Sequence, residues 1–159
     1  MRVLPQAASG LTKLSEGLFL ESYQDDAGIW TVGYGHTAGV KPGMVITEQQ
    51  ADDFLAQDLA NAQAIVEKYV TVPLNDNQYG ALVDFVFNVG KGMPGVKSGF
   101  VYLRNGQPST LLKLINQGQY SLAAQQFALW NKCDGRVLNG LTARRKAEAD
   151  LWNKPTNEA

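Results

Sequence analysis

The sequence predicts an α+β, predominantly helical fold with two lobes, a small β-hairpin lobe and a larger helical lobe, joined by a long helix. Three observations predict it. Aromatic and β-branched residues interleave as in strands only over residues 19–35, apolar residues recur with helical period over 48–69, and helical patterns fill most of 75–153.

The length of 159 residues suits one domain, and a hydrophobic content of 45% is enough to build its core. We therefore expect a single domain over residues 1–159. Within it, the hairpin lobe should occupy about 13–60, the connecting helix 48–69, and the helical lobe 70–153 together with the N-terminal helix.

The first predicted element is a helix over residues 10–18, because Leu11, Leu14 and Leu18 recur at the helical spacing of i, i+3 and i+7. Glu16 lies off this apolar stripe, near the C-terminal end of the helix. We expect its carboxyl group to overlook the segment that follows.

That segment is a predicted β-hairpin with a turn at residues 26–28. A three-residue loop pairs Asp25 with Ile29, and the two-residue period of a strand then places Thr31 on the same face as Asp25, roughly 7 Å away on the diagonal. A helix-end carboxyl group, a strand-end carboxylate and a hydroxyl group would thus converge on one cleft.

Helices account for most of the remaining chain. Residues 47–50 fit a capping box for a helix that runs to Tyr69, about 22 residues or roughly 33 Å long. Asn75 should cap a helix that is apolar nearly all round and forms the core of the second lobe. After a loop region rich in Gly at 92–108, two more helices are expected at 109–116 and 121–132, capped by Ser109 and Ser121.

Charge is unevenly distributed although the net charge is −1. Residues 1–69 carry nine acids and four bases, whereas residues 70–159 carry six acids and ten bases. The densest basic cluster is Arg144, Arg145 and Lys146 in the last predicted helix. It could contact anionic polymers or the phosphates of an outer membrane, or it could be a solvated helix face with i, i+4 ion pairs to residues 148 and 150.

The candidate catalytic residues are Glu16, Asp25 and Thr31. Cleavage of a glycosidic bond needs two carboxyl groups in unlike settings, one protonated to release the leaving oxygen and one ionised to handle water or the oxocarbenium charge. Each residue alone also has an ordinary interpretation as a solvated helix charge, a turn aspartate or a strand threonine. Their joint spacing within the run 28–37 favours the catalytic interpretation.

Other chemistries have less support in the sequence. With one cysteine, Cys133, and one histidine, His36, there is neither an intramolecular disulfide nor a cluster of soft metal ligands, so we expect no metal and no cofactor. The sequence also has no serine-hydrolase elbow, phosphate loop or dinucleotide fingerprint. His36 is expected to brace the hairpin through Asp52, Asp53 or Asp58 on the long helix.

The spacing of Glu16, Asp25 and Thr31, followed by Gly-Tyr-Gly-His-Thr at 33–37, resembles the catalytic signature of bacteriophage-type lysozymes, glycoside hydrolase family 24. The resemblance covers about residues 9–153. It includes the segments 85–90, 109–112, 123–127 with Trp130, 140–141 and 144–148.

This resemblance implies a lysozyme-like fold and an endolysin, or muramidase, that hydrolyses the β-1,4 bond between N-acetylmuramic acid and N-acetylglucosamine. Glu16 would be the general acid, and Asp25 with the Thr31 hydroxyl would orient the attacking water. Position in the motifs implies glycan contacts at Gly35, Thr37 and Phe100.

The resemblance also implies a monomer that acts on peptidoglycan, uses no cofactor and does not bind nucleic acid. Residues 3–12, the longest uncharged N-terminal run, neither span a membrane nor resemble a signal peptide, so we expect accumulation in the host cytoplasm and release to the periplasm by a holin. Two alternatives are a non-catalytic peptidoglycan-binding module and a basic nucleic-acid-binding helical domain. The aromatic residues speak against the second, because they lie at core-like spacings and do not interleave with Lys and Arg.

Overall fold

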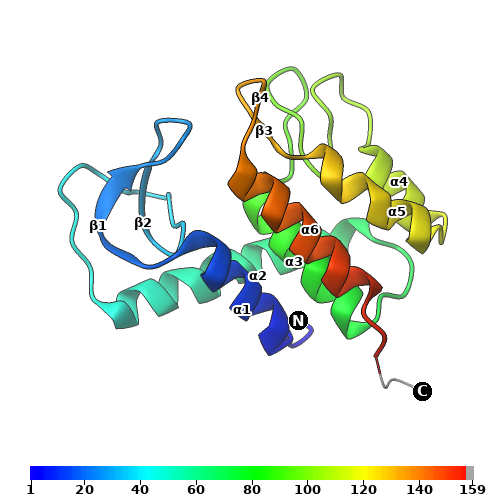
Figure 1. Ribbon diagram of the computed structural model, residues 1–159, viewed down its shortest axis with the longest axis horizontal. Helices are drawn as coiled ribbons and strands as arrows, with labels where there is room; N and C mark the ends of the chain where they lie inside the picture. The colour runs from blue at the N-terminus through cyan, green and yellow to red at the C-terminus, as the bar shows by residue number, and fades with distance from the viewer. Residues whose placement is uncertain (157–159) are drawn as a thin grey trace.

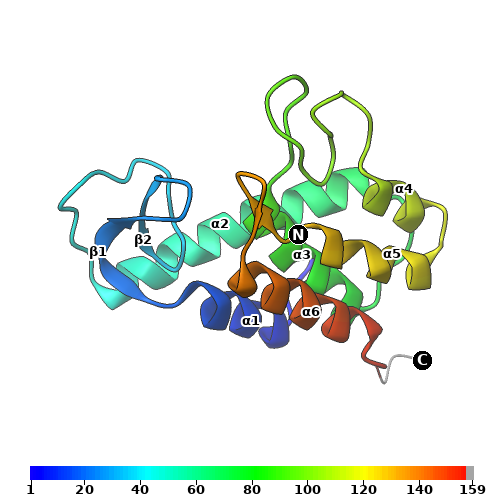
Figure 2. The same cartoon turned by 45° about the horizontal axis from the view of Figure 1, so that its top comes forward.

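Two lobes lie at opposite ends of a long helix in the computed structural model, which describes residues 1–156; the last three residues of the predicted domain, 157–159, lie outside the described part. Figures 1 and 2 show the hairpin lobe at one end of this helix and the helical lobe at the other. This confirms the predicted two-lobed α+β fold. The elements in chain order are α1 (Gln6–Glu16), β1 (Phe19–Gln24), β2 (Trp30–Gly33), α2 (Glu48–Tyr69), α3 (Asp76–Val89), α4 (Thr110–Asn116), α5 (Tyr120–Gln126), the 3₁₀ helix η1 (Phe127–Leu129), β3 (Lys132–Cys133), β4 (Arg136–Val137) and α6 (Asn139–Asn153).

The hairpin has the register that the sequence predicts. Tyr23 lies opposite Thr31 in the antiparallel pair β1–β2, and the Asp25 amide donates to the Ile29 carbonyl at 2.9 Å. Asp25 and Thr31 therefore face the same side of the hairpin, since the side-chain period of a strand is two.

The predicted capping box of α2 and the predicted Asn75 cap of α3 are both present. The Thr47 hydroxyl accepts from the Gln50 amide at 3.1 Å, and the Gln50 side chain accepts from the Thr47 amide at 2.8 Å. The same reciprocal pair joins Asn75 and Gln78 at the start of α3. These local signals place α2 and α3 correctly because each involves residues only three apart.

Helix α3 is the centre of the helical lobe, and its residues from Tyr79 to Val86 are all buried. It packs against α1, α2 and α6. The core around it is made mainly of aliphatic and aromatic residues from α2, α3, α4, η1 and α6 and includes Leu55, Leu59, Val66, Leu82, Phe85, Phe100, Leu111, Ile115, Phe127 and Trp152. A smaller core of Val32, Ile46 and Ala51 holds the hairpin lobe on the first turn of α2.

The apolar stripe expected for the first helix is wrong. Helix α1 begins at Gln6, its buried residues are Ala8 and Thr12, and Leu14 is 85% exposed. The helix packs closely through small residues instead, because a Cβ atom on Gly80 would lie 2.9 Å from the Cβ atom of Ala8. The prediction that Glu16 lies near the end of this helix is nevertheless confirmed.

The segment after α4 also differs from the prediction. Ser109 caps α4 by accepting from the Leu112 amide at 3.0 Å, as expected, but α5 begins at Tyr120 with no side-chain cap from Ser121. The predicted helix over 121–132 ends at Gln126 and continues only as η1. The short hairpin β3–β4 follows, turning through Asp134 and Gly135, both of which have positive φ.

No helix within residues 1–156 is long and apolar enough to cross a membrane.

Candidate active site

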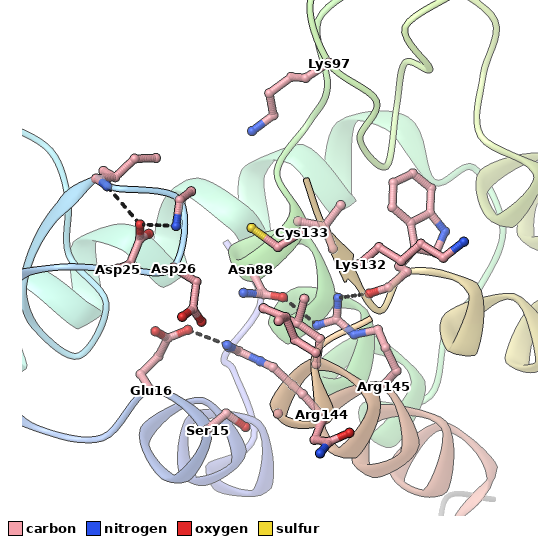
Figure 3. Close-up of a pocket in the computed structure, with 18 of the residues that line it drawn as sticks. Ser15, Glu16, Asp25, Asp26, Asn88, Lys97, Lys132, Cys133, Arg144 and Arg145 are labelled. Atoms are coloured by element: carbon pink, nitrogen blue, oxygen red, sulfur yellow. Dashed lines mark hydrogen bonds and ion pairs between the residues drawn. The ribbon is translucent and has the colours of Figure 1, made fainter. Parts of the chain in front are cut away.

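A cavity of about 930 Å³ lies between the two lobes. Its hairpin side is formed by the end of α1 and by residues 23–29, and its other side by the end of α3, by Lys97 and Ser98, by the β3–β4 hairpin and by the start of α6. Figure 3 shows the carboxyl groups of Glu16, Asp25 and Asp26 on the first side, with Lys97 and Lys132 on the second. The cleft therefore has one acidic and one basic wall.

Glu16 is the last residue of α1, and its side chain is 16% exposed. It forms an ion pair with the Nη1 atom of Arg144, from α6 (Figure 3). The backbone of Gly35 passes directly beside its carboxyl group, so that a Cβ atom added to Gly35 would lie 2.7 Å from the Glu16 Cδ atom. Glu16 is thus held from two sides, by segments that are far apart in the sequence.

Asp25 is held by its own turn. Its Oδ1 atom accepts hydrogen bonds from the backbone amides of Ala27 and Ile29, both at 2.9 Å (Figure 3). Because both amides bind the same oxygen, Oδ2 is the atom directed to other partners. This aspartate turn is common turn chemistry, and it also fixes a carboxylate at the mouth of the cleft.

Thr31 does not line the cleft. Its side chain is almost fully buried, and its hydroxyl group donates to the Ile29 carbonyl at 2.9 Å. The structure therefore brings Glu16 and Asp25 into one cavity, and places Thr31 behind the turn that holds Asp25.

The three predicted glycan contacts are in different settings. Gly35 and Thr37 line a second, smaller pocket of about 220 Å³, together with residues of α2 and α3. Phe100 has no exposed surface, because it packs edge to face against Phe85 in the core of the helical lobe. Its ring therefore does not reach the cleft in this structure, and the glycan contact of Phe100 stays a prediction.

His36 does brace the hairpin against α2. Its Nδ1 atom lies 2.7 Å from the Asp58 Oδ2 atom, and its ring stacks on Phe54 with 4.0 Å between centroids. Of the three carboxylates that the sequence left open, the structure selects Asp58.

The expectation of an exposed basic cluster in α6 is wrong for two of its three residues. Arg144 and Arg145 are buried, and only Lys146 is exposed, where it forms the predicted pair with Asp150 at 2.8 Å. Arg145 pairs with Glu148 at 2.7 Å, and Arg144 faces the cleft. Only Lys146 of the three could therefore contact an outer membrane.

Sequence reasoning missed Asp84, which lies on α3 with no exposed surface. Its carboxylate accepts from Arg144 Nε at 3.1 Å, from Arg144 Nη2 at 2.8 Å and from the Thr12 hydroxyl at 2.7 Å. The signal that could have found it was a single acid within the otherwise apolar run 79–87 of α3, since a buried carboxylate requires a partner.

Burial and partners shift the titration of this buried group in opposite directions. Burial raises the pKa of Asp84, but hydrogen bonds from Glu148 and Arg144 outweigh burial, so the pKa lies below its ordinary value. Burial raises the pKa of Glu148 well above its ordinary value, and the hydrogen bond with Asp84 raises it further. Asp84 is thus the ionised partner of Arg144, and Glu148 holds its proton more tightly.

This difference predicts how stability depends on pH. Folding raises the pKa of Glu148 above its ordinary value of 4.5. The protonated Glu148 therefore contributes its full share of folding stability below pH 4.5, and this share is lost as pH rises through the pKa of the folded state. The Tm of the wild type should therefore fall relative to that of Glu148→Gln as pH rises, by about 2–4 °C per kcal/mol of linkage. Thermal melts followed by circular dichroism at a series of pH values from 4.5 upward measure the two Tm values, with the exposed Asp150→Asn as control. A difference in Tm between wild type and Glu148→Gln that stays constant with pH would contradict the prediction.

The site offers no support for metal or thiol chemistry. Among residues 1–156, no group of three or more His, Cys, Asp or Glu side chains is placed to hold a metal ion. Cys133 lines the cleft, but burial and the negative charges of Asp134, Asp26 and Asp25 raise the pKa of its thiol, which disfavours the nucleophilic thiolate. Glu16 and Asp25 therefore stay the candidate reactive pair of this cleft.

Comparisons with known proteins agree with this chemistry. The sequence model of the family described as "Phage lysozyme" matches residues 13–148. The endolysin of Acyrthosiphon pisum secondary endosymbiont phage 1 is 42% identical over 146 residues, which cover 89% of this chain and 92% of the relative. The endolysin of Salmonella phage P22 is 37% identical over 92% of this chain and 96% of its own.

Solved structures show the same similarity. The muramidase domain of SpmX from Asticaccaulis excentricus superposes with a TM-score of 0.79 at 32% identity, covering 98% of this chain and all of that domain. An endolysin from Escherichia coli O157:H7 phage FAHEc1 gives a TM-score of 0.77 at 34% identity, over 96% of this chain and 94% of that one.

Proposed function

Because this chain belongs to the phage lysozyme family, we propose that its inter-lobe cleft cleaves the β-1,4 bond between N-acetylmuramic acid and N-acetylglucosamine. The chain is a glycoside hydrolase, an endolysin whose substrate is peptidoglycan. The observation that carries the proposed chemistry is the convergence of Glu16 and Asp25, from a helix end and a hairpin turn, on one cavity of about 930 Å³.

Glu16 acts as the general acid in this proposal. It donates its proton to the glycosidic oxygen as the bond to the anomeric carbon breaks, and water attacks that carbon. Asp25 accepts the proton of the water through Oδ2, since Oδ1 already accepts two amide hydrogen bonds. Proton exchange with solvent then returns both carboxyl groups to their starting states.

The products of wall digestion test this bond assignment. Purified peptidoglycan is digested, reduced with borohydride and hydrolysed, and the reduced sugar is identified. Muramitol is the expected product, because cleavage leaves N-acetylmuramic acid at the reducing end. Glucosaminitol, or new amino termini without new reducing ends, would contradict the proposal, and binding without any product would support the non-catalytic alternative.

Thr31 supports Asp25 in one of two ways. The Ile29 carbonyl accepts from both the Thr31 hydroxyl and the Asp25 amide, each at 2.9 Å, so the hydroxyl braces the turn in this state. By rotating, it can instead share the attacking water. Both roles act through Asp25 and require the hydroxyl group.

Thr31→Val should therefore lower kcat about 10-fold, the effect of roughly one lost hydrogen bond, whereas Thr31→Ser should stay close to wild type. In an Asp25→Ala background, Thr31→Val should cause little further loss, because residues that act as a unit are not additive. Initial rates on a soluble glycan oligomer measure all four variants. Multiplicative losses would show that Thr31 acts independently of Asp25.

Hydrolysis should proceed with inversion. A water molecule between Asp25 and the sugar requires carboxyl groups about 6.5–9.5 Å apart and leaves no covalent intermediate. Early proton NMR spectra of products from a β-linked oligomer should show the α-anomer before mutarotation. An initial β-anomer, or a glycosyl adduct on Asp25 in mass spectra, would identify Asp25 as a nucleophile.

The chain acts on the cell wall at lysis, as the endolysins to which it is similar imply. We propose further that it accumulates in the host cytoplasm, that a holin releases it to the periplasm, and that it works as a monomer without binding nucleic acid. A relative named SAR-endolysin, from Bacteriophage PS119, is 36% identical to it over 142 residues, which cover 87% of this chain.

A further inference from the structure

Arg144 lies between two carboxylates that come from different helices. Its Nη1 atom pairs with Glu16, at the end of α1, while its Nε and Nη2 atoms donate to the two oxygens of Asp84, on α3. The side chain of Arg144 is 5% exposed and that of Asp84 is fully buried. The three residues therefore form a buried line from the helical core to the cleft.

The geometry of a guanidinium group makes this arrangement rigid. The group is planar, and its donors point in fixed directions, so two parallel hydrogen bonds to one carboxylate define both its position and its plane. Once Asp84 holds Nε and Nη2, the direction of Nη1 is determined. The Glu16 carboxyl group can then form its ion pair with Arg144 Nη1 in only one position.

Asp84 is itself firmly anchored. The Thr12 hydroxyl donates to its Oδ1 atom at 2.7 Å from one turn before Glu16 on α1. Both charges of the Asp84–Arg144 pair are stable under ordinary conditions, since the partners lower the pKa of Asp84 and raise that of Arg144 in spite of burial. Asp84 thus connects α3, α6 and α1 behind the proposed acid.

We propose that Asp84 is a positioning residue for catalysis, which sets the location of the Glu16 carboxyl group by holding Arg144. This inference rests on the proposed role of Glu16 as general acid. A displacement of about 1 Å at a reacting group can cost as much as 10²-fold in rate, so loosening this support should affect the chemical step.

Asp84→Asn tests the inference because it keeps the shape of the side chain but turns an amide NH₂ group toward one of the two Arg144 donors. We expect kcat on a soluble glycan oligomer to fall at least about 10-fold, with KM within about two-fold of wild type, since Asp84 does not line the cleft. Rates are expressed per folded molecule, with the folded fraction taken from circular dichroism at the assay temperature.

Asp76→Asn is the matched control. Asp76 lies on the same helix and also pairs with an arginine, Arg2 at 2.7 Å, but does so on the surface. Its kcat should equal that of the wild type. Equal kcat values for Asp84→Asn and wild type would overturn the inference, as would a purely KM effect.

A double variant separates this inference from the proposed function. If Asp84 acts through Glu16, adding Asp84→Asn to Glu16→Gln should cause no further loss of activity. A further, independent loss would overturn the inference while leaving Glu16 as the acid. Substantial activity in Glu16→Gln alone would instead overturn the proposed acid.

If Asp84→Asn does not fold, hydrogen exchange in the wild-type protein tests the inference instead. The Nε hydrogen of Arg144 should exchange with solvent much more slowly than those of the exposed Arg104 and Arg136 in NMR spectra. Exchange at the rate of the exposed arginines would show that Asp84 does not hold Arg144 and would overturn the inference.

Discussion

Glu16→Gln should lower the lytic rate by at least about 10²-fold, the smallest effect expected when a general acid is removed. Glutamine has nearly the shape of glutamate, and its amide oxygen can still accept from Arg144, but it has no proton to give to the leaving oxygen. The variant should therefore fold and bind peptidoglycan while failing in the chemical step. Initial rates on purified walls, with Tm from circular dichroism, measure both parts of the prediction.

Glu21→Gln is the control for this substitution. Glu21 lies in β1 of the same lobe, is exposed, and undergoes the same chemical change outside the cleft. Its activity should be unchanged. More than about a tenth of the wild-type rate in Glu16→Gln, judged against the effect expected for a general acid, would remove Glu16 from that role.

Gly35→Ala should produce a loss of similar size, about 10²-fold in kcat, because the new methyl group competes with the Glu16 carboxyl group for space. The added Cβ atom would lie 2.7 Å from Glu16 Cδ, closer than non-bonded carbon atoms approach, and 3.1 Å from Cγ, a tight contact. Either Glu16 or the loop must move. The ion pair with Arg144 limits where Glu16 can go.

Gly39→Ala separates this steric effect from backbone strain. Gly39 has φ +71° and Gly35 has φ +74°, so alanine is strained to a similar degree at both positions, by about 1–2 kcal/mol. A Cβ atom on Gly39 would have no neighbour within 4 Å. Gly39→Ala should lose Tm through strain alone and keep its kcat, whereas Gly35→Ala should lose at least as much Tm and also lose kcat. If Gly35 served only as a glycan contact, its substitution would raise KM and leave kcat intact.

The first hairpin shows which features of the fold can be predicted from residues that are close together in the sequence. The register of β1 and β2, the turn that holds Asp25 and the location of Glu16 at a helix end were all predictable, because each depends on residues within a few positions of one another. The two capping boxes were predictable for the same reason. The catalytic signature, and with it the family and its activity, is recognisable from the residue types and their spacing over 16–37.

The surroundings of the candidate catalytic carboxyl groups could not be predicted in this way. Arg144 is 128 positions from Glu16 and 60 from Asp84, and no periodicity in α6 distinguishes it from the exposed Lys146. A charged side chain is buried only where folding brings it a partner, so its exposure is a property of the partner's position. The predicted solvated face was therefore wrong at Arg144 and Arg145, although the pair of Lys146 and Asp150 within one helix was correct.

Chain-local signals thus determined α2, α3, α4, the register of the first hairpin and the candidate carboxyl groups of this protein, because the hydrogen bonds and turns involved form between residues near one another in the sequence. Tertiary structure alone decided that Thr31 and Phe100 are buried, that Asp58 is the partner of His36, and that Gly35 and Arg144 hold Glu16 in place. The contacts of Glu16 and His36 join segments that are far apart in the sequence and meet only in the folded protein. Their energies depend on close fit and on the loss of water around charges, which arise only once the lobes are assembled.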